Sequence, residues 1–450
     1  MKSRSQQSFG LSFIEKILLN FYSFLVAIVV QICVFSLKFK FIRSKKIKRQ
    51  LQDRPLTSTE FIDKLRSNKF FDANKKLGFF FCSSAGEYEQ AKPLIDRCII
   101  AHMHCLVVFF SRSGFDFALS QNDPQKSKSE FFLLSIPDYY LHWQKILALF
   151  QVQFVCIIRH ELWPGLIYAA STLSNLQIVN IEFRAISLSG FIKLILLKRA
   201  QRIYCVNEES KRMLSSYGVL IEKMKATGDT KYDRVLERAQ KNNSNQIHPI
   251  SAKNLTLIIG SAWPPDIEIV VTTFKEIIKQ SSAIFPWQVV IAPHDISPDM
   301  IKKIERILLE HDLTYSIETE LGINSNKSPI TILKSMGKLA EFYAMSQISF
   351  VGGAMHHRVH NVLEPACYGN SIAFGPNYQT SPEACAMVKN CVATVINTSQ
   401  ELKNWWLNEH QRLLENPNQS KNQASANFVK SLAGSANLIF DDLLTHINAR

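Results

Sequence analysis

The sequence has few of the features that mark fibrous, disulfide-stapled or zinc-binding chains. Gly and Pro number only 16 each among 450 residues, which excludes collagen-like and low-complexity chains. The nine cysteines are scattered, odd in number and contain no C-x-x-C pair. This argues against a disulfide framework and a thiolate zinc site, and favours a reducing compartment. The length of 450 residues is typical of about two or three domains, and the 46% of hydrophobic residues is enough for a large core.

Acidic residues are nearly absent from the first 50 residues. This segment holds ten Lys or Arg residues and a single acid, Glu15, so it carries +9 of the formal net charge of +14. A nucleic-acid-binding protein usually spreads its basic groups over a folded domain. Because the basicity belongs to one segment, we expect a membrane rather than a nucleic acid as partner.

An uncharged run from Ile17 to Leu37 is followed at once by a cluster of basic residues, 38–49. As a helix this run would be roughly 30 Å long, close to the thickness of a bilayer core. The basic cluster predicts that the C-terminal side is cytoplasmic and attracts anionic headgroups. A cleavable signal peptide and a buried core helix are the alternatives. We expect a membrane anchor, either spanning or lying in one leaflet.

Beyond about residue 75, short runs rich in Val, Ile and Phe alternate with amphipathic stretches. Such runs are typical of strands buried on both faces of a parallel sheet, and their alternation with helices predicts βαβ units. The expected strands form two series: 78–82, 105–110, 154–158, 177–181 and 202–206, then 255–260, 287–292, 330–334, 348–353, 371–375 and 392–396. The sequence thus predicts an α/β protein of two doubly wound domains facing a cleft.

The polar, turn-rich segment 241–249 separates the two series and sets the expected domain boundary. We expect an anchor and basic segment at 1–50, a first domain at 51–240, and a second domain at 241–450 that includes the C-terminal helices. In sheets of this kind ligands bind at the carboxyl ends of strands.

Three candidate residues follow strands of the first series. Ser84 and Glu87 have the spacing of a capping box, but Glu87 is also placed to take a proton from an attacking hydroxyl. Glu161 either stabilises a helix start or orients a cleft residue, and the adjacent His160 is interpreted as structural. Lys231, in GDTKYDRV, lies either near a phosphate or in a solvated turn.

Candidate nucleotide-binding residues end strands of the second series. Ser261 lies in IIGSAWPPD and His294 in IAPHDIS, where a hydroxyl, backbone N–H groups and an imidazole can meet a nucleotide. Gly352 and Gly353 close the strand at 348–353, and glycine lets the backbone approach a ligand closely.

The segment HNVLEP is expected to open a helix. Asn361 and Glu364 either form a capping pair, or the helix start binds an anion while Glu364 accepts hydrogen bonds from ribose hydroxyls. His356 and His360 have i, i+4 spacing, but no helix is expected before Asn361, so we expect no metal site.

Taken together and in this order, SAGEYEQAKPLI, ELWPGLI, GDTKYDRV, GSAWPPD, APHDIS and HNVLEPACYGNSIAFGPNY resemble the Kdo (3-deoxy-D-manno-octulosonic acid) transferases of lipopolysaccharide synthesis, in particular the Bacteroidetes-type lipid IVA enzymes. The resemblance covers roughly residues 10–430. It implies a GT-B fold of two Rossmann-like domains, with the acceptor on the first and the donor CMP-Kdo on the second. It further implies an inverting transfer of Kdo to a lipid A precursor at the cytoplasmic face of the inner membrane, without a cofactor.

By motif, Glu87 matches the family's general base, and Lys231 matches the basic residue of the G-[DN]-x-[KR]-[FY]-D motif. With Glu161, Lys231 is assigned to the acceptor or a phosphate. The donor-binding positions implied by the resemblance are Ser261, His294, Gly352, Gly353, His360, Asn361 and Glu364.

The chain departs from the family pattern at residues 355–359, where MHHRV replaces a glycine-rich continuation. These side chains either crowd the nucleotide, or Arg358 contacts its phosphate. A GT-B transferase with another nucleotide-sugar donor and an inactive membrane-tethered paralogue therefore stay open as alternatives.

Overall fold

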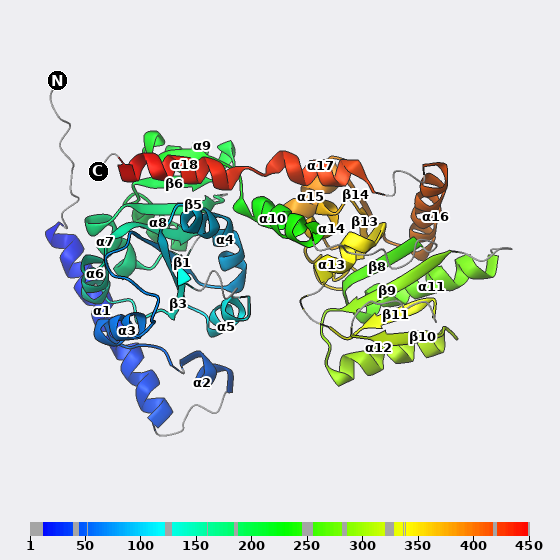
Figure 1. The fold of residues 1–450 in the computed structure, drawn as a ribbon, viewed down its shortest axis with the longest axis horizontal. Coiled ribbons are helices and arrows are strands. Elements are labelled where there is room, and N and C mark those ends of the chain that lie inside the picture. Colours follow the sequence, from blue (N-terminus) through cyan, green and yellow to red (C-terminus); the bar gives the residue numbers. More distant parts are fainter. Residues whose placement is uncertain are drawn as a thin grey trace. The chain divides into compact units, whose positions relative to one another are not determined.

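The computed structural model describes residues 12–38, 45–51, 53–121, 128–159, 161–183, 188–244, 255–280, 286–319, 328–335, 337, 339–416 and 421–448. His160 and part of the expected boundary segment 241–249 lie outside these ranges. The chain divides into two compact units, one formed by Met1–Arg234 with Ala433–Arg450 and the other by Val235–Leu432. The elements are labelled in Figure 1.

The first unit is built on a seven-stranded sheet in the order β3-β2-β1-β4-β5-β6-β7. All neighbouring strands are parallel. Its strands are β1 (Leu77–Cys82), β2 (His104–Phe109), β3 (Glu130–Leu134), β4 (Val152–Ile158), β5 (Leu176–Ile181), β6 (Arg202–Cys205) and β7 (Met224–Ala226). Its helices are α1 (Phe13–Lys38), α2 (Lys45–Leu51), α3 (Ser58–Arg66), α4 (Ala85–Ile100), α5 (Arg112–Ser120), α6 (Tyr140–Leu149), α7 (Pro164–Leu173), α8 (Leu188–Leu197), α9 (Glu208–Ser216) and α18 (Ser435–Asn448), and α10 (Thr230–Ser244) leads into the second unit.

The second unit repeats this architecture with the order β10-β11-β9-β8-β12-β13-β14, again wholly parallel. Its strands are β8 (Leu255–Ala262), β9 (Trp287–Pro293), β10 (Tyr315–Glu318), β11 (Ile330–Leu333), β12 (Ile348–Val351), β13 (Ser371–Phe374) and β14 (Ala393–Val395). Its helices are α11 (Pro264–Gln280), α12 (Pro298–Glu310), α13 (Leu339–Met345), α14 (Leu363–Cys367), α15 (Pro382–Lys389), α16 (Ser399–Glu415) and α17 (Gln423–Leu432).

The prediction of two doubly wound parallel sheets is confirmed, and every predicted strand is present with ends shifted by at most two residues. The continuous apolar runs arise because helices cover both faces of each sheet. Phe79 and Phe81 belong to the core cluster on one face, while Phe80 belongs to the other and meets Phe154 edge to face at 5.4 Å.

The last helix belongs to the first unit, whereas the sequence analysis assigns all of 241–450 to the second domain. In α18, Asp442 accepts hydrogen bonds from the Arg202 guanidinium (3.0 Å) and the Tyr204 hydroxyl (3.0 Å). Ile439 and Leu443 of the same helix are buried in the core of the first sheet. These hydrogen bonds join residues 240 and 238 positions apart in the sequence. The sequence pattern alone therefore does not predict that the C-terminal helix packs on the first unit.

The predicted N-terminal helix is present as α1, which begins at Phe13 rather than Ile17. By length and composition its stretch Phe13–Cys33 is apolar enough to cross a membrane. One side of the helix lies against the first unit, since the Tyr22 hydroxyl donates to Asp138 (3.0 Å). Large apolar side chains on the rest of α1 are exposed, among them Phe21, Phe24, Ile28 and Ile32.

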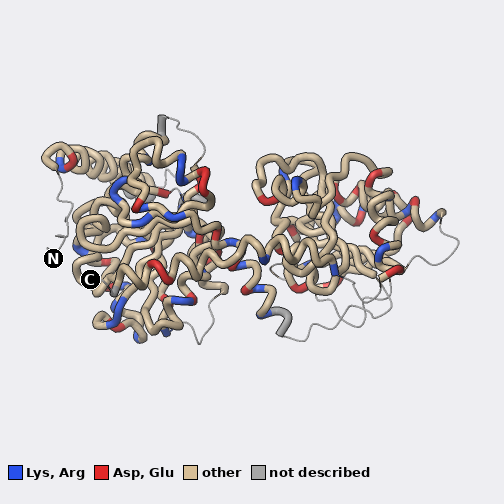
Figure 2. Tube along the Cα trace, turned by 90° about the horizontal axis from the view of Figure 1, so that it is seen from above, with Lys and Arg blue, Asp and Glu red and all other residues tan. Residues whose placement is uncertain are grey.

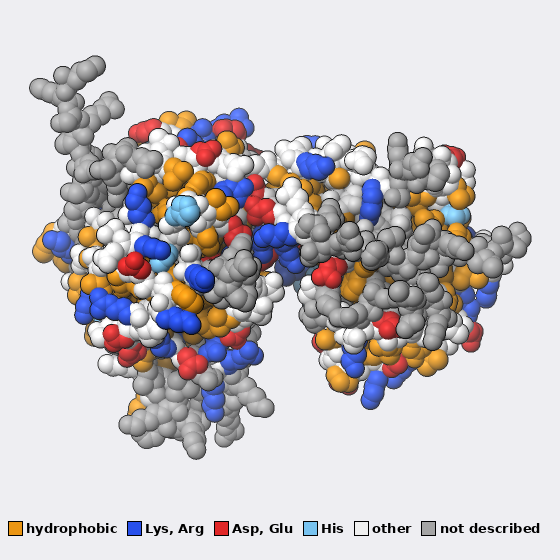
Figure 3. Space-filling view, in the orientation of Figure 1, with side chains coloured by type: hydrophobic (Ala, Val, Ile, Leu, Met, Phe, Trp, Pro, Cys, Tyr) orange, Lys and Arg blue, Asp and Glu red, His pale blue; other side chains and the backbone are white. Residues whose placement is uncertain are grey.

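Lys, Arg, Asp and Glu residues are distributed along the described trace of both units (Figure 2). On the face drawn in Figure 3, hydrophobic and charged side chains are interspersed.

Candidate active site

Several of the predicted site residues lie at the topological switch point of each sheet. In the first sheet the chain order reverses between β1 and β4, and in the second between β8 and β12. Open α/β sheets bind ligands outside the carboxyl ends of the strands at such points. Glu87 and Glu161 follow β1 and β4, while Ser261 ends β8 and Gly352 follows β12. The topology thus brings residues far apart in sequence to the carboxyl edge of each sheet.

Glu87 lies in the first turn of α4, directly after β1. Ser84 caps the helix by accepting from the Glu87 backbone N–H (3.3 Å), and one oxygen of the Glu87 carboxylate, Oε2, accepts from the Ser83 backbone N–H. The capping interpretation is therefore correct in part. The second oxygen, Oε1, makes no hydrogen bond to the described residues, so the same carboxylate keeps one oxygen for another partner.

The pKa of the Glu87 carboxyl lies in the physiological range. Burial raises the pKa of its carboxyl to about 7, and the nearby charge of Glu161 also raises it. The Ser83 N–H and the Arg159 guanidinium act in the opposite direction. A carboxylic acid with a pKa near the working pH is suited to general acid–base chemistry.

Arg159 and Lys231 share one buried carboxylate beside this site. Asp229 accepts from Arg159 (3.0 Å) and lies 3.3 Å from the Lys231 ammonium. Arg159 also donates to the Gln90 side chain (2.7 Å), one turn along α4 from Glu87. The structure therefore brings the predicted Lys231 into the surroundings of Glu87, and adds Arg159 and Asp229, which the sequence analysis did not select.

A second, uncharged network holds these groups in place. The Asn180 amide donates to the Thr230 hydroxyl (2.7 Å), and that hydroxyl donates to the Gln90 carbonyl oxygen (2.6 Å). All three residues come from different elements of the first unit. The motifs GDTK and SAGEYEQAKPLI contain Thr230 and Gln90, whereas Asn180 lies in none of the motifs.

The glycine turn after β12 is required by close backbone approach. A Cβ on Gly352 would lie 2.6 Å from the Ser261 carbonyl oxygen. Gly353 has φ +94°, and a Cβ there would lie 2.3 Å from the Arg358 carbonyl oxygen. Ser261 itself has φ +52°, an uncommon conformation for a residue with a side chain. The predicted residues Ser261, Gly352 and Gly353 thus form one tightly packed backbone junction.

Asp266 holds this junction together by hydrogen bonds. The sequence analysis does not include Asp266 among the candidate residues. Its buried carboxylate accepts hydrogen bonds from the backbone N–H groups of Gly353 (2.8 Å), Trp263 (2.9 Å) and Met355 (3.4 Å). Burial raises the pKa of Asp266, while these donors lower it. The motif GSAWPPD holds the signal, because an acid three residues after Trp263 can cap the start of α11.

Two predicted histidines stack on each other and on a tryptophan. The rings of His294 and His360 are 4.6 Å apart, and those of Trp263 and His294 are 4.7 Å apart, both nearly parallel. The Trp263 indole N–H donates to His360 Nε2 (3.1 Å). Burial lowers the pKa of His360 to about 4, helped by the charges of His294 and Arg358. His360 is therefore neutral at physiological pH.

The predicted helix start at Asn361 is wrong by two residues. Helix α14 begins at Leu363, and the Asn361 side chain accepts from the Leu363 N–H (3.0 Å) in a turn that precedes it. The expected Asn361–Glu364 capping pair does not form, since Glu364 instead lies 3.3 Å from Arg238. Among the described residues, no cluster of three or more His, Cys, Asp or Glu side chains is arranged to hold a metal ion.

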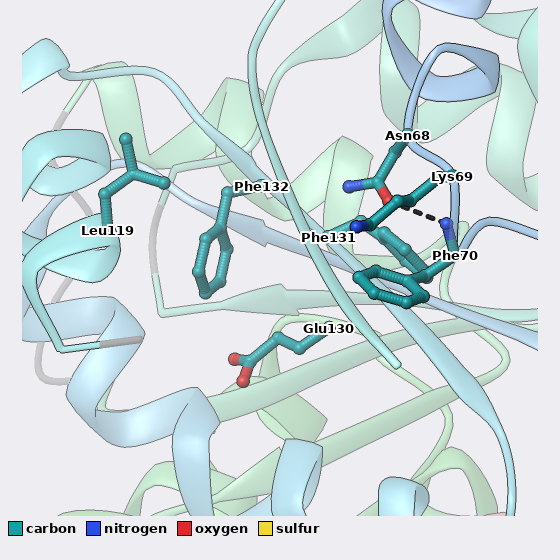
Figure 4. Close-up of a pocket in the computed structure, with 7 residues that line it drawn as sticks. All are labelled: Asn68, Lys69, Phe70, Leu119, Glu130, Phe131 and Phe132. Atoms are coloured by element: carbon teal, nitrogen blue, oxygen red, sulfur yellow. Dashed lines mark hydrogen bonds between the residues drawn. The ribbon is translucent and has the colours of Figure 1, made fainter. Parts of the chain in front are cut away.

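A pocket of about 360 Å³ beside β3 belongs to neither switch point (Figure 4). Glu130 lines it, but the Glu130 carboxylate is bound by Lys92 and by the Tyr88 hydroxyl (3.1 Å). The Asn68 side chain accepts from the Phe70 N–H (3.0 Å). Because these polar groups are already satisfied within the fold, we assign this pocket no function.

Comparison with solved structures supports the predicted GT-B type fold of two Rossmann-like domains. UDP-GlcNAc 2-epimerase from Neisseria meningitidis superimposes with a TM-score of 0.59 at 15% identity, covering 82% of this chain and 100% of that chain. A glycosyltransferase from Rickettsia africae gives a TM-score of 0.52 at 13% identity, covering 84% and 98%. With identities this low, the likeness concerns the fold alone.

Sequence comparison supports the family resemblance. Residues 59–234 match the family model described as 3-deoxy-D-manno-octulosonic-acid transferase (kdotransferase). A bifunctional glycosyltransferase/methyltransferase of Fusobacterium nucleatum is 27% identical over 70% of this chain and 50% of its own length. Transferases of 3-deoxy-D-manno-octulosonic acid from Rickettsia bellii and Aquifex aeolicus are 25% and 23% identical, over 58% and 65% of this chain and 61% and 74% of theirs.

The chain spans only about half to three fifths of the length of the first two of these relatives. The Bacteroidetes-type subgroup stays a prediction, because none of these relatives tests it. The family match covers most of the first unit, including the segments of Glu87, Glu161 and Lys231. Together with the curated transferases that align beyond it, this match supports the assignment to the Kdo transferase family, with the family model itself covering residues 59–234.

Proposed function

We propose that this protein is an inverting glycosyltransferase that moves Kdo from CMP-Kdo to the lipid A precursor lipid IVA during lipopolysaccharide synthesis. The observation that carries the proposal is the Glu87 carboxyl at the switch point of the first sheet. It has one oxygen without a described partner and a pKa raised to about 7. Family membership supplies the substrate class, because the related curated proteins are transferases of 3-deoxy-D-manno-octulosonic acid.

In the proposed step, Glu87 accepts the proton from a glucosamine hydroxyl of the acceptor as its oxygen attacks the anomeric carbon of Kdo. A new C–O bond forms, the bond from the anomeric carbon to the CMP phosphate oxygen breaks, and CMP leaves with the bonding electron pair. Attack opposite the leaving group inverts the configuration. Glu161 and the Lys231–Asp229–Arg159 group hold the acceptor or its phosphate.

The donor is proposed to bind at the switch point of the second sheet. The Ser261 hydroxyl and the close-packed Gly352–Gly353 backbone receive the nucleotide, and His294, His360 and Asn361 surround it. Glu364 accepts hydrogen bonds from the ribose hydroxyls in this assignment, while Arg238 orients its carboxylate. The cleft between the two domains stays a prediction.

We further propose that α1 anchors the protein at the cytoplasmic face of the inner membrane. Its apolar stretch, its exposed outer side chains and the basic residues 38–49 support this location. The acceptor lipid then reaches Glu87 without leaving the bilayer.

The test is mass spectrometry of lipid IVA after incubation with CMP-Kdo and the purified full-length protein. We expect a mass increase of one or more Kdo units, and loss of the product with Glu87→Gln. A parallel thermal-shift series with CMP, CDP and UDP separates the donor alternatives, because a ligand that binds only the folded state raises its stability. Stabilisation by UDP alone would indicate another sugar donor, and no product with any donor would indicate an inactive paralogue.

A further inference from the structure

A second, larger pocket in the first unit lies between α1 and the sheet. Its volume is about 520 Å³, within the range of roughly 300–1,000 Å³ that is common for ligand sites. Apolar side chains line most of it, among them Val26, Val30 and Cys33 from α1 and Phe81, Phe110 and Trp163 from the domain. The pocket therefore has one wall made by the membrane-anchor helix.

The charged residues at this pocket are already bound within the fold. The Arg54 guanidinium donates to the backbone carbonyl oxygens of Ser135 (2.9 Å) and Phe110. Asp138 accepts from the Tyr22 hydroxyl (3.0 Å) and the Trp143 indole (2.8 Å), as well as from two backbone N–H groups. Because these groups face protein partners, the interior offers a ligand mainly apolar surface.

Backbone hydrogen bonds connect the pocket-lining residue Phe110 and its neighbour to the segment that carries the candidate base. Phe110 N–H donates to the Cys82 carbonyl (3.2 Å), and Ser111 N–H donates to the Ser83 carbonyl (3.0 Å). Ser83 in turn donates its own N–H to Glu87. Trp163, two residues after Glu161, packs its ring 4.7 Å from that of Phe110. The Phe110–Trp163 end of the pocket therefore lies next to the segments that carry Glu87 and Glu161.

One polar group at this end lacks a partner. The indole nitrogen of Trp163 is buried and has no acceptor among the residues that the structure describes. Buried donors are usually satisfied, so this N–H is available to an acceptor that binds beside it. An ester or amide carbonyl at the head of an acyl chain can supply that acceptor.

We propose that this pocket holds one acyl chain of the lipid acceptor, with the carbonyl of that chain beside Trp163 and the sugar hydroxyl beside Glu87. The proposal rests on the proposed function, and it adds a subsite that binds an acyl chain of the acceptor. A chain entering between α1 and the domain stays next to the bilayer while its sugar reaches the base.

Filling the pocket tests this assignment. Val30→Phe places a larger side chain in the pocket, whereas Ile32→Phe makes a similar change at a 60% exposed position of the same helix. We expect Val30→Phe to raise the KM for lipid IVA at least tenfold while the CMP-induced thermal shift is unchanged, and Ile32→Phe to leave both unchanged. Equal effects of the two variants, or none from Val30→Phe, would overturn the proposal.

A second experiment measures whether the pocket is occupied by lipid, and it does not depend on enzymatic turnover. Cys33 lines the pocket and Cys391 is exposed in the second unit, so their alkylation by N-ethylmaleimide can be compared in one sample. In phosphatidylcholine nanodiscs, we expect lipid IVA to slow alkylation of Cys33 severalfold and not that of Cys391. The same sugar phosphate without acyl chains should give no protection.

The outcomes separate the two proposals. Protection of Cys33 without Kdo transfer keeps the acyl subsite and overturns the proposed function. Transfer without protection keeps the function and overturns the subsite. Full protection before lipid IVA is added would assign the pocket to bilayer phospholipid instead, which also overturns this proposal.

Discussion

The indole N–H of Trp263 donates to Nε2 of His360 over 3.1 Å, although the two residues are 97 positions apart in the sequence. Since Nε2 accepts this bond, the ring proton of neutral His360 lies on Nδ1. The low pKa of His360, about 4, keeps it in this state at physiological pH. The tryptophan therefore sets which ring nitrogen of His360 accepts a hydrogen bond and which one donates.

We predict that Trp263→Phe weakens CMP binding by roughly two- to tenfold, the effect of losing one hydrogen bond worth ~0.5–1.5 kcal/mol. The variant keeps an aromatic ring to stack on His294 but leaves Nε2 of His360 without its donor. Isothermal titration calorimetry with CMP measures the affinity. Trp287→Phe is the matched control, because Trp287 donates to His410 over 3.2 Å in a similar pair away from the switch point. Equal loss in both variants would contradict a role in binding.

We predict that Gly353→Ala abolishes detectable CMP binding and lowers stability. The new Cβ would lie 2.3 Å from the Arg358 carbonyl oxygen, so the turn after β12 must move. Overpacking of this kind typically costs ~1–3 kcal/mol. Denaturant unfolding and calorimetry with CMP measure the two effects. Gly337→Ala is the control, since Gly337 also has a positive φ (+83°) but, apart from its chain neighbours, no residue that the structure describes lies within 4 Å of a Cβ there. Retained binding in Gly353→Ala would show that the turn does not contact the nucleotide.

Much of the fold follows from the sequence because most strands are buried on both faces. Continuous apolar runs such as Phe79–Phe81 and Val289–Ile291 indicate strands buried on both faces, and these residues are buried in the structure. The strands that were missed, β3, β7 and β10, all lie at sheet edges. Strand β7 has three residues and β10 alternates polar with apolar residues, as expected where one side is open. Strand β3 carried a usable signal in its four apolar residues, 131–134.

The candidate site was harder to predict than the fold. Residues at the ends of strands, such as Glu87 and Ser261, follow from the βαβ pattern and the motifs. The network partners do not, because Asn180 meets Thr230, and Trp263 meets His360, only through the folded backbone. Because Asn is a common cap, the sequence predicts a helix start at Asn361. In the structure, Asn361 instead closes a turn that precedes α14.

We predict that Asp266→Asn lowers both stability and nucleotide affinity. Its carboxylate accepts from three backbone N–H groups, and an amide offers only one acceptor oxygen while placing an NH₂ against those donors. Leaving a buried donor unpaired costs ~1–3 kcal/mol. Urea unfolding should show this loss, and calorimetry should show weaker CMP binding. Asp312→Asn, at an exposed ion pair with Lys275, should change neither quantity by a comparable amount.

We predict that kcat/KM for Kdo transfer rises with pH and levels off above about 7, because the proposed base Glu87 must be deprotonated and its pKa is about 7. Glu161→Gln removes a charge that raises this pKa, so the inflection of the pH–rate profile should move to lower pH. Glu209→Gln, at an exposed position in the first turn of α9, should leave the inflection unchanged. An inflection that stays fixed in Glu161→Gln would remove Glu87 as its source.

The same pKa predicts a stability signature that does not depend on substrate. The folded-state pKa of Glu87 lies above its ordinary value of 4.5, so between pH 4.5 and 7 the folded protein binds more protons at this residue than the unfolded chain does. The contribution of Glu87 to stability is therefore greatest below pH 4.5 and is lost as the pH rises through 7. Glu87→Gln removes this dependence while keeping an oxygen for the Ser83 N–H. Its melting temperature relative to wild type should rise from pH 5 to pH 8, and a constant difference would mean that Glu87 titrates at its ordinary pKa.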